Sequence, residues 1–111
     1  MPRNTNLPLT ETAYYILLAL VSPAHGYAIM QAVERLSAGD VRLAAGTLYG
    51  ALENLLAKGL ILAQPSDDPR RKVYVLSPAG RRALDADAQR MQHMLAVTGA
   101  VLEEGEPRCA G

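Results

Sequence analysis

Hydrophobic residues recur every three or four positions in four stretches of the chain, which is the pattern of helices with one buried face. Thr10 and Ser77 stand where helix N-caps are preferred, and Gly59 stands where a left-handed C-cap is favoured. The predicted helices cover residues 11–21, 25–37, 44–58 and 78–103. The residues expected to face the core from the first three helices are Ala13, Ile16, Leu17, Leu20, Tyr27, Met30, Val33, Leu36, Leu48, Leu52, Leu55 and Leu56.

A different pattern follows the third predicted helix. Residues 60–64 and 70–76 form two β-capable runs, and the segment between them is rich in Pro, Ser and Asp. This arrangement predicts a hairpin with a longer loop. In the second run, strand alternation sends the side chain of Arg71 to the face opposite Arg70 and Lys72.

The order of the predicted elements is helix, helix, helix, hairpin and long helix, which matches a winged helix-turn-helix. We therefore predict a mainly α fold with a small β-hairpin wing, followed by a long C-terminal dimerisation helix. The winged-helix DNA-binding domain is assigned to residues 1–77, with the wing at about 60–76. In such a domain the third helix enters the major groove of DNA and the hairpin forms the wing.

The last predicted helix carries an apolar seam. Its residues follow one another at spacings of 4, 3, 4, 3 and 4, which is the heptad pattern of packed helices. A lone helix of this length needs a partner, so we expect one edge to pack on the domain and the other on a second copy. Residues 78–104 are assigned to this dimerisation helix and 105–111 to a flexible tail. The seam residues are Leu84, Ala88, Met91, Leu95, Thr98 and Leu102.

Composition narrows the class of protein. The 111 residues fit one domain, and the longest apolar run, 13–21, is too short to cross a bilayer. Cys109 is the single cysteine, which excludes an intramolecular disulfide and suits a cytoplasmic protein. The sequence holds no cluster of metal ligands, no nucleophile with a base at motif spacing and no phosphate-binding loop. We therefore expect no metal, no cofactor, no membrane contact and no enzyme activity.

Charge is unevenly distributed along a chain whose net charge is zero. Residues 35–82 hold eight basic and four acidic residues, whereas 83–111 hold two basic and five acidic residues. A basic middle indicates that this part of the protein meets an anion. Because the bulk charge is neutral, nucleic-acid binding has to be argued from the local pattern.

Three stretches of the chain stand in a specific order and spacing. They are Ile16-Leu17-Leu18-Ala19-Leu20 followed by His25-Gly26-Tyr27-Ala28-Ile29; Gly46-Thr47-Leu48-Tyr49 followed by Leu52, Leu55 and Gly59-Leu60-Ile61; and Arg71-Lys72-Val73-Tyr74-Val75-Leu76-Ser77 with Gly80. In these stretches, which span about residues 9–84, the chain resembles the PadR family of transcriptional regulators.

The resemblance implies a winged-helix homodimer on a palindromic operator, with a C-terminal helix that swaps partners across the dimer axis. The short chain is similar to the compact subgroup, which has one helix after the wing. Some members of that subgroup bind flat aromatic compounds in a pore between the subunits, using a tryptophan. This sequence has Met91 at the nearest matching position and no tryptophan, so it lacks the residue on which those members stack their ligand.

The predicted DNA-binding residues lie on the third helix and the wing. A helix N-terminus and hydroxyl groups can bind phosphate, and the Asn54 amide can read adenine with two hydrogen bonds. Gly50 either allows another backbone to approach closely or is a solvent-facing glycine. Asp67 and Asp68 either keep the wing tip away from the DNA backbone or orient Arg70 and Arg71. The DNA-binding set is Arg42, Thr47, Tyr49, Gly50, Asn54, Arg70, Arg71 and Lys72.

A second candidate site involves the first and last predicted helices. Apolar and aromatic residues there could line a pocket for a small apolar or aromatic effector, or they could simply pack in the dimer interface. These residues are Tyr14, Tyr15, Met91, Met94 and Leu95. His25 is interpreted as a turn residue that supports the second helix.

The leading hypothesis is a cytoplasmic repressor whose partners are double-stranded DNA, a second copy of itself and a small effector. The alternative is a winged-helix module that binds protein instead of DNA, and zero net charge and the acidic wing tip are its support. DNA capture by variants of Arg70, Arg71 and Lys72 separates the two hypotheses.

Overall fold

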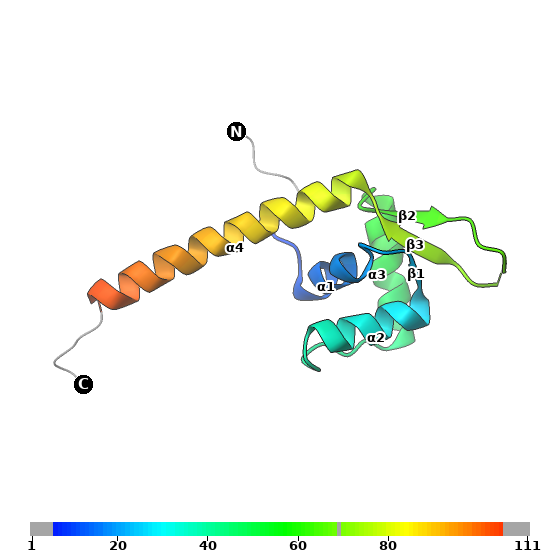
Figure 1. Cartoon of the computed structure of the whole chain (residues 1–111), viewed down its shortest axis with the longest axis horizontal. Coiled ribbons are helices and arrows are strands. Elements are labelled where there is room, and N and C mark those ends of the chain that lie inside the picture. Colours follow the sequence, from blue (N-terminus) through cyan, green and yellow to red (C-terminus); the bar gives the residue numbers. More distant parts are fainter. Residues whose placement is uncertain (1–5, 69, 106–111) are drawn as a thin grey trace.

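The helices and the wing lie where the hydrophobic pattern predicts them (Figure 1). The computed structural model describes residues 6–68 and 70–105, so Cys109 and most of the predicted tail lie outside the described residues. In Figure 1, the first three helices and the sheet gather at one end of the last helix, whose other end extends away from them. The elements are α1 (Glu11–Ala19), β1 (Ala24–His25), α2 (Gly26–Leu36), α3 (Ala45–Ala57), β2 (Ile61–Gln64), β3 (Val73–Leu76) and α4 (Pro78–Gly105). The predicted fold class, mainly α with a β wing, is confirmed.

The wing belongs to a three-stranded antiparallel sheet in the order β1-β3-β2. Ala24 of β1 pairs with Tyr74 of β3, and Ile61 of β2 pairs with Leu76 of β3. The sequence prediction missed β1, because a two-residue strand is too short to show an alternating pattern. The predicted second strand is also too long, because β3 begins at Val73 and not at residue 70.

The core forms where the apolar faces of the three short helices meet. Most of the predicted inward residues of α1 and α3 are confirmed as buried, and they pack together with Ile29 and Val33 of α2. The predictions for Tyr27 and Leu36 are wrong: Tyr27 is 65% exposed and Leu36 is 44% exposed. Gly26, Ile29 and Val33 form the buried face of α2 at i, i+3 and i+7, which leaves Tyr27 on the margin.

Ser77 joins the end of α3 to the start of α4. Its backbone N–H donates to the carbonyl of Leu60, and its hydroxyl donates to the carbonyl of Gly59 at 2.6 Å. The same hydroxyl accepts from the N–H of Gly80 at 2.9 Å, which is the predicted N-cap contact. Gly59 has φ +73°, as a left-handed C-cap requires. At Gly80 a Cβ would overlap the Leu60 carbonyl oxygen, so glycine is needed there for close packing.

The α4 helix has two halves with different surroundings. In the first half, Ala83, Leu84 and Asp87 are buried in the same chain, against α1 and the rest of the core. Leu84 is 5% exposed, so this member of the predicted dimer seam is already covered by its own domain. From Met91 to Glu104 the helix residues are exposed. The compact core therefore crosses the predicted boundary at residue 77 and ends about halfway along α4. Among the described residues, no helix is both long enough and apolar enough to span a membrane.

Candidate nucleic-acid interface

The outer face of α3 is polar and small, because the leucines of this helix point inward. Leu48, Leu52 and Leu55 are buried, which turns Thr47, Gly50 and Asn54 to the surface. A Cβ placed on Gly50 would meet nothing within 4 Å, so within the described chain it is a solvent-facing glycine. Thr47 and Gly50 are small, so the first turns of this face can come close to a duplex, which suits a helix that enters the major groove.

Tyr49 lies between α3, the start of α2 and the wing. Its side chain is 49% exposed, and its hydroxyl lies against Gly26. The ring lines a hollow of about 460 Å³ that opens between the α2 N-terminus and the wing. The residues around this wing hollow are His25, Gly26, Tyr27, Tyr49, Asp68, Arg70, Arg71 and Lys72.

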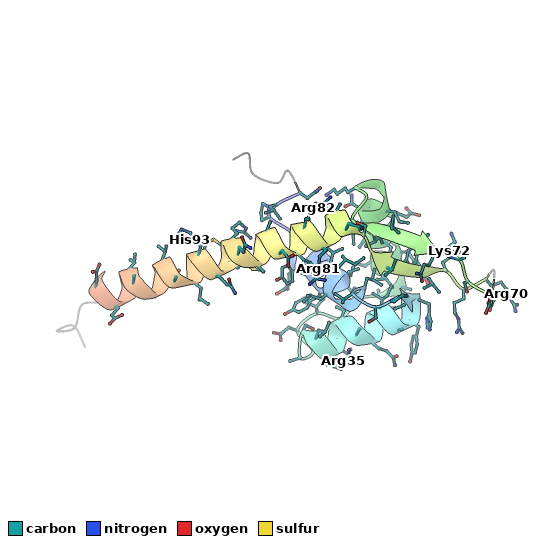
Figure 2. All side chains as sticks on the ribbon, turned by 45° about the horizontal axis from the view of Figure 1, so that its top comes forward. Arg35, Arg70, Lys72, Arg81, Arg82 and His93 are labelled. Atoms are coloured by element: carbon teal, nitrogen blue, oxygen red, sulfur yellow. The ribbon has the colours of Figure 1, made fainter. Side chains whose placement is uncertain are left out.

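The three wing cations all line this hollow, whereas the adjoining hollows are lined by Arg70 or by Arg71 but not by both. All three precede β3, so the alternation of strand side chains does not apply to them. Figure 2 shows Arg70 and Lys72 at the end of the molecule opposite the far end of α4. In the described part of the chain no acidic side chain pairs with Arg71 or Lys72. These two positive charges are therefore available to an external anion.

Asp68 orients Arg70. A carboxylate oxygen of Asp68 accepts a hydrogen bond from the Arg70 N–H at 2.9 Å and lies 3.6 Å from the guanidinium Nε. The Asp68 N–H in turn donates to the Ser66 hydroxyl. Of the two interpretations of the acidic wing tip, this geometry supports orientation of Arg70, while neither bond reaches Arg71.

A second hollow, of about 320 Å³, lies next to the first. Tyr49, Glu53, Leu56, Arg70, Lys72 and Tyr74 line it. Burial raises the pKa of the Tyr74 phenol above its ordinary value, and the neighbouring Tyr49 and Glu53 raise the pKa further. Glu53 places a negative charge between α3 and the wing. This charge attracts the neighbouring cations Arg70 and Lys72 and repels an approaching anion.

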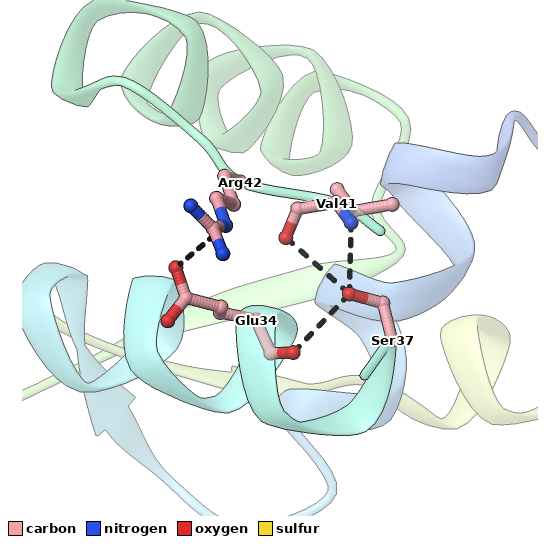
Figure 3. Close-up of polar contacts among 4 residues, drawn as sticks. All are labelled: Glu34, Ser37, Val41 and Arg42. Carbon is pink, nitrogen blue, oxygen red and sulfur yellow. Dashed lines mark hydrogen bonds and ion pairs between the residues drawn. The ribbon is translucent and has the colours of Figure 1, made fainter. Parts of the chain in front are cut away.

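Arg42 lies in the turn between α2 and α3, outside both hollows (Figure 3). Its guanidinium Nε is 3.5 Å from a Glu34 carboxylate oxygen, and both side chains are more than half exposed. The buried Ser37 hydroxyl orders this turn, because it bonds the carbonyls of Glu34 and Val41 and accepts from the Val41 N–H at 2.9 Å. Arg42 is thus held at the entry to α3, apart from the wing cations.

His25, Gly26 and Tyr27 line the wing hollow, although they are not among the binding residues predicted from the sequence. β1 pairs His25 with Val73, which brings the start of α2 beside the wing. The available signal was the His25-Gly26-Tyr27 stretch, which contributed to the family resemblance. The pairing that gives this stretch its position could not be recognised without β1.

The predicted effector residues are only partly brought together. Tyr14, Tyr15 and Met91 line a hollow of about 500 Å³ between α1 and α4, together with Leu9, Glu11, Leu18 and Asp87. Met94 and Leu95 do not line it; Leu95 is 73% exposed further along α4.

Asp87 closes the floor of this effector hollow. Its carboxylate is 1% exposed and accepts from the Arg90 guanidinium at 2.7 Å. The Leu9 backbone N–H also donates to it, at 3.4 Å. This carboxylate therefore ties the segment before α1 to α4.

The far half of α4 presents an uncovered apolar surface. Of the predicted seam, Met91, Leu95, Thr98 and Leu102 are exposed, and Ala88 is half-buried. Thr98 donates its hydroxyl hydrogen bond to the Met94 carbonyl one turn earlier. The further exposed apolar residues of this half are Met94, Val97 and Val101. His93 also lies on this half of the helix (Figure 2), and the described residues include no group of three His, Cys, Asp or Glu suited to a metal ion.

Comparison with curated proteins finds a protein of a transposon and a transcriptional regulator. The chain is 40% identical over 94 residues to an uncharacterized 37.1 kDa protein in transposon TN4556 of Streptomyces fradiae, which is 83% of this chain and 25% of that protein. It is 36% identical over 63 residues to transcriptional regulator Rv3488 of Mycobacterium tuberculosis, which is 55% of this chain and 59% of that protein. The chain thus matches less than two thirds of the length of either relative.

Solved structures with the same fold include a PadR family transcriptional regulator from Eggerthella lenta. It is 26% identical, with a TM-score of 0.67, over 83% of this chain and 81% of that chain. The complex structure of hsRosR-S1, from H. salinarum, is also 26% identical, with a TM-score of 0.62, over 85% of this chain and 95% of that chain. The model of the transcriptional regulator PadR-like family matches residues 16–86. As the resemblance in the sequence predicted, this chain belongs to the transcriptional regulator PadR-like family.

Proposed function

We propose that this chain is a transcriptional repressor that binds a palindromic operator in duplex DNA as a homodimer in the cytoplasm. The observation that carries the proposal is the wing hollow, where Arg71 and Lys72 stand without acidic partners in the described chain beside the exposed face of α3. A groove-reading helix next to unpaired cations can combine base contacts with phosphate neutralisation. Repression then follows from exclusion of the polymerase from the promoter.

In this proposal the two surfaces of the interface have separate tasks. Thr47, Gly50 and Asn54 face the major groove, and Asn54 is the residue suited to reading adenine. Arg71, Lys72 and the Tyr49 hydroxyl contact phosphates, and Arg42 adds a positive charge at the entry to α3. Arg70 is exposed but already has the Asp68 carboxylate beside it, so we assign Arg70 a smaller share of the phosphate contacts than its neighbours.

The dimer is proposed from the far half of α4. Its exposed apolar residues follow the heptad spacing, and a second copy would remove them from water. Two winged domains related by a two-fold axis bind half-sites about one helical turn, roughly 34 Å, apart. This requirement explains why the operator is proposed to be palindromic.

The hollow between α1 and α4 is proposed as the effector site. Its volume of about 500 Å³ falls within the range of small-molecule pockets, roughly 300–1,000 Å³. Its lining of two tyrosines, two leucines and a methionine suits a small apolar or aromatic effector. Because the hollow lies against α4, an occupant would change how the two winged domains are spaced.

The proposal is tested by selecting duplexes from a random library with the full chain and measuring its mass in solution. We expect the selected DNA to contain an inverted repeat and the free protein to sediment as a dimer. A monomer at all concentrations, or no DNA retained even at low salt, would contradict the proposal. The second outcome would favour a winged-helix module that binds protein.

A further inference from the structure

Gly26, the first residue of α2, is buried beneath the Tyr49 ring. A Cβ on Gly26 would lie 2.5 Å from the Tyr49 hydroxyl oxygen, 3.1 Å from Cζ and 3.5 Å from Cε1. These three nearest atoms all belong to the same side chain. Contacts below 3.0 Å are essentially never made by real Cβ atoms, so the ring could not keep its place over an alanine.

The need for glycine at this position arises from space and not from backbone conformation. The left-handed glycines of the described chain are Gly39 and Gly59, whereas Gly26 has an ordinary helical position at the start of α2. An alanine would therefore be accepted by the backbone of α2, and by helix propensity it would even be favoured. The single obstacle close to the added methyl group is Tyr49.

The position of the Tyr49 ring decides the shape of both hollows at the wing. The ring lines the 460 Å³ hollow with the wing cations and the 320 Å³ hollow with Glu53 and Tyr74. On the first side, Tyr49 lines the hollow with Arg71 and Lys72, and its hydroxyl lies at Gly26, which lines the same hollow. The Asp68 carboxylate also lines it but is paired with Arg70, so the phenol hydroxyl and the other two cations remain as hydrogen-bond donors suited to a phosphate group.

We propose that Gly26 is a positioning residue for DNA binding. Because it has no side chain, it leaves room for the Tyr49 hydroxyl beside Arg71 and Lys72, and these three side chains hold one backbone phosphate. The proposal rests on the proposed DNA-binding function and adds a residue that does not itself need to touch DNA. Gly26 acts through Tyr49, so its substitution has an effect only while the Tyr49 side chain is present.

A double-mutant cycle with Gly26→Ala and Tyr49→Ala tests this dependence on the selected operator. In the wild-type background, Gly26→Ala is expected to weaken binding about tenfold, the size of one charge-assisted hydrogen bond. In the Tyr49→Ala background, the same change is expected to alter binding less than about twofold, because the obstacle is gone. An equal loss in both backgrounds, or no loss in either, overturns the proposal.

Three further measurements separate positioning from damage to the fold. Gln31→Ala is the control, since Gln31 is exposed on the same helix and lines neither hollow, and it is expected to leave operator affinity unchanged. The salt dependence of binding is expected to keep its slope in Gly26→Ala, because no cation is removed. If Gly26→Ala lowers the thermal stability, the Gly26→Ala/Tyr49→Ala double variant is expected to recover it, and failure to recover overturns the proposal. Absence of operator binding by the wild type would instead refute the proposed function itself.

Discussion

The wing and the far half of α4 occupy opposite ends of the molecule and have opposite chemistry (Figure 2). The wing gathers Arg70, Arg71 and Lys72 around a polar hollow, whereas the far half of α4 exposes leucine, valine and methionine. Charge contacts made by the wing are screened by salt, whereas apolar contacts made by α4 depend on the apolar area removed from water. The two ends can therefore be tested separately, because a change of ionic strength acts mainly on one of them.

Leu95→Glu is expected to give the largest effect, at the apolar end. Leu95 is 73% exposed and contributes nothing to the core of its own chain, so the fold should survive. A carboxylate in the proposed seam would be buried without a partner, which costs about 3–5 kcal/mol and weakens the dimer by a factor on the order of a thousand. Analytical ultracentrifugation measures the dissociation constant.

Ala96→Glu is the control for this variant, because the next residue lies about 100° around the helix and outside the seam. A dimer that tolerates Leu95→Glu as well as Ala96→Glu would show that the apolar end does not carry the association.

Gly80→Ala tests the close packing that joins the start of α4 to the winged domain, and so connects the two ends. The added methyl group would overlap the backbone carbonyl oxygen of Leu60, so either the start of α4 or the end of α3 must shift. We expect the free energy of unfolding to fall by about 2–3 kcal/mol, the range of an overpacked core. Gly99→Ala in the same helix, with open space around its Cβ, should not destabilise the protein in the same denaturant titration.

The double variant Arg71→Ala/Lys72→Ala tests the contribution of the basic end to DNA binding. The variant frees one phosphate in each subunit of the dimer, so the slope of log K against log salt should become shallower by about 1.8, at 0.9 for each phosphate, and binding should weaken about a hundredfold at low salt. Fluorescence anisotropy on a labelled operator at four salt concentrations gives both quantities. Arg82→Ala, which removes one cation outside the wing hollow, should leave the slope as it is. Equal slopes for wild type and the double variant would place the phosphate contacts elsewhere.

Tyr74→Phe is expected to give the smallest effect. It changes how the stability of the fold depends on pH in the alkaline range. The raised pKa means that the folded state holds the phenolic proton more tightly than the unfolded chain does. This contribution is fully present below the ordinary pKa of about 10 and is lost as the pH rises through the higher folded value. The variant should therefore lose less stability than wild type between pH 9 and 11, roughly the range around that pKa.

Thermal unfolding at each pH measures this difference. Tyr27→Phe, which changes an exposed phenol, serves as the comparison and should follow wild type.

The sequence predicts the helices well because burial and capping act locally. The leucines of α3 and the caps at Thr10, Gly59 and Ser77 are visible as residue types at fixed spacings, and the structure confirms them. The outward face of α3 follows directly, since a helix whose inner face is known has only one outer face.

What the sequence could not predict depends on pairing between distant segments. β1 exists only because β3 pairs with it, and this pairing brings His25 and Gly26 to the wing. The start of β3 at Val73 is also set by its partners, so strand alternation does not extend to Arg71. Leu84 shows the same limit, because a heptad pattern cannot distinguish a residue that packs on its own domain from one that awaits a second copy.

The single hydroxyl of Ser77 has a mechanical consequence. It bonds to the Gly59 carbonyl after α3 and to the Gly80 N–H in α4, so both helices are fastened at one point. From there the 28 residues of α4 extend about 42 Å at 1.5 Å per residue, so the helix is a long arm that carries the winged domain at its Ser77 end. A rotation of the helix by about 10° around its far end would move Ser77 and the attached domain by roughly 7 Å, a fifth of the roughly 34 Å between half-sites. Small changes where two copies cross are thus enlarged at the DNA.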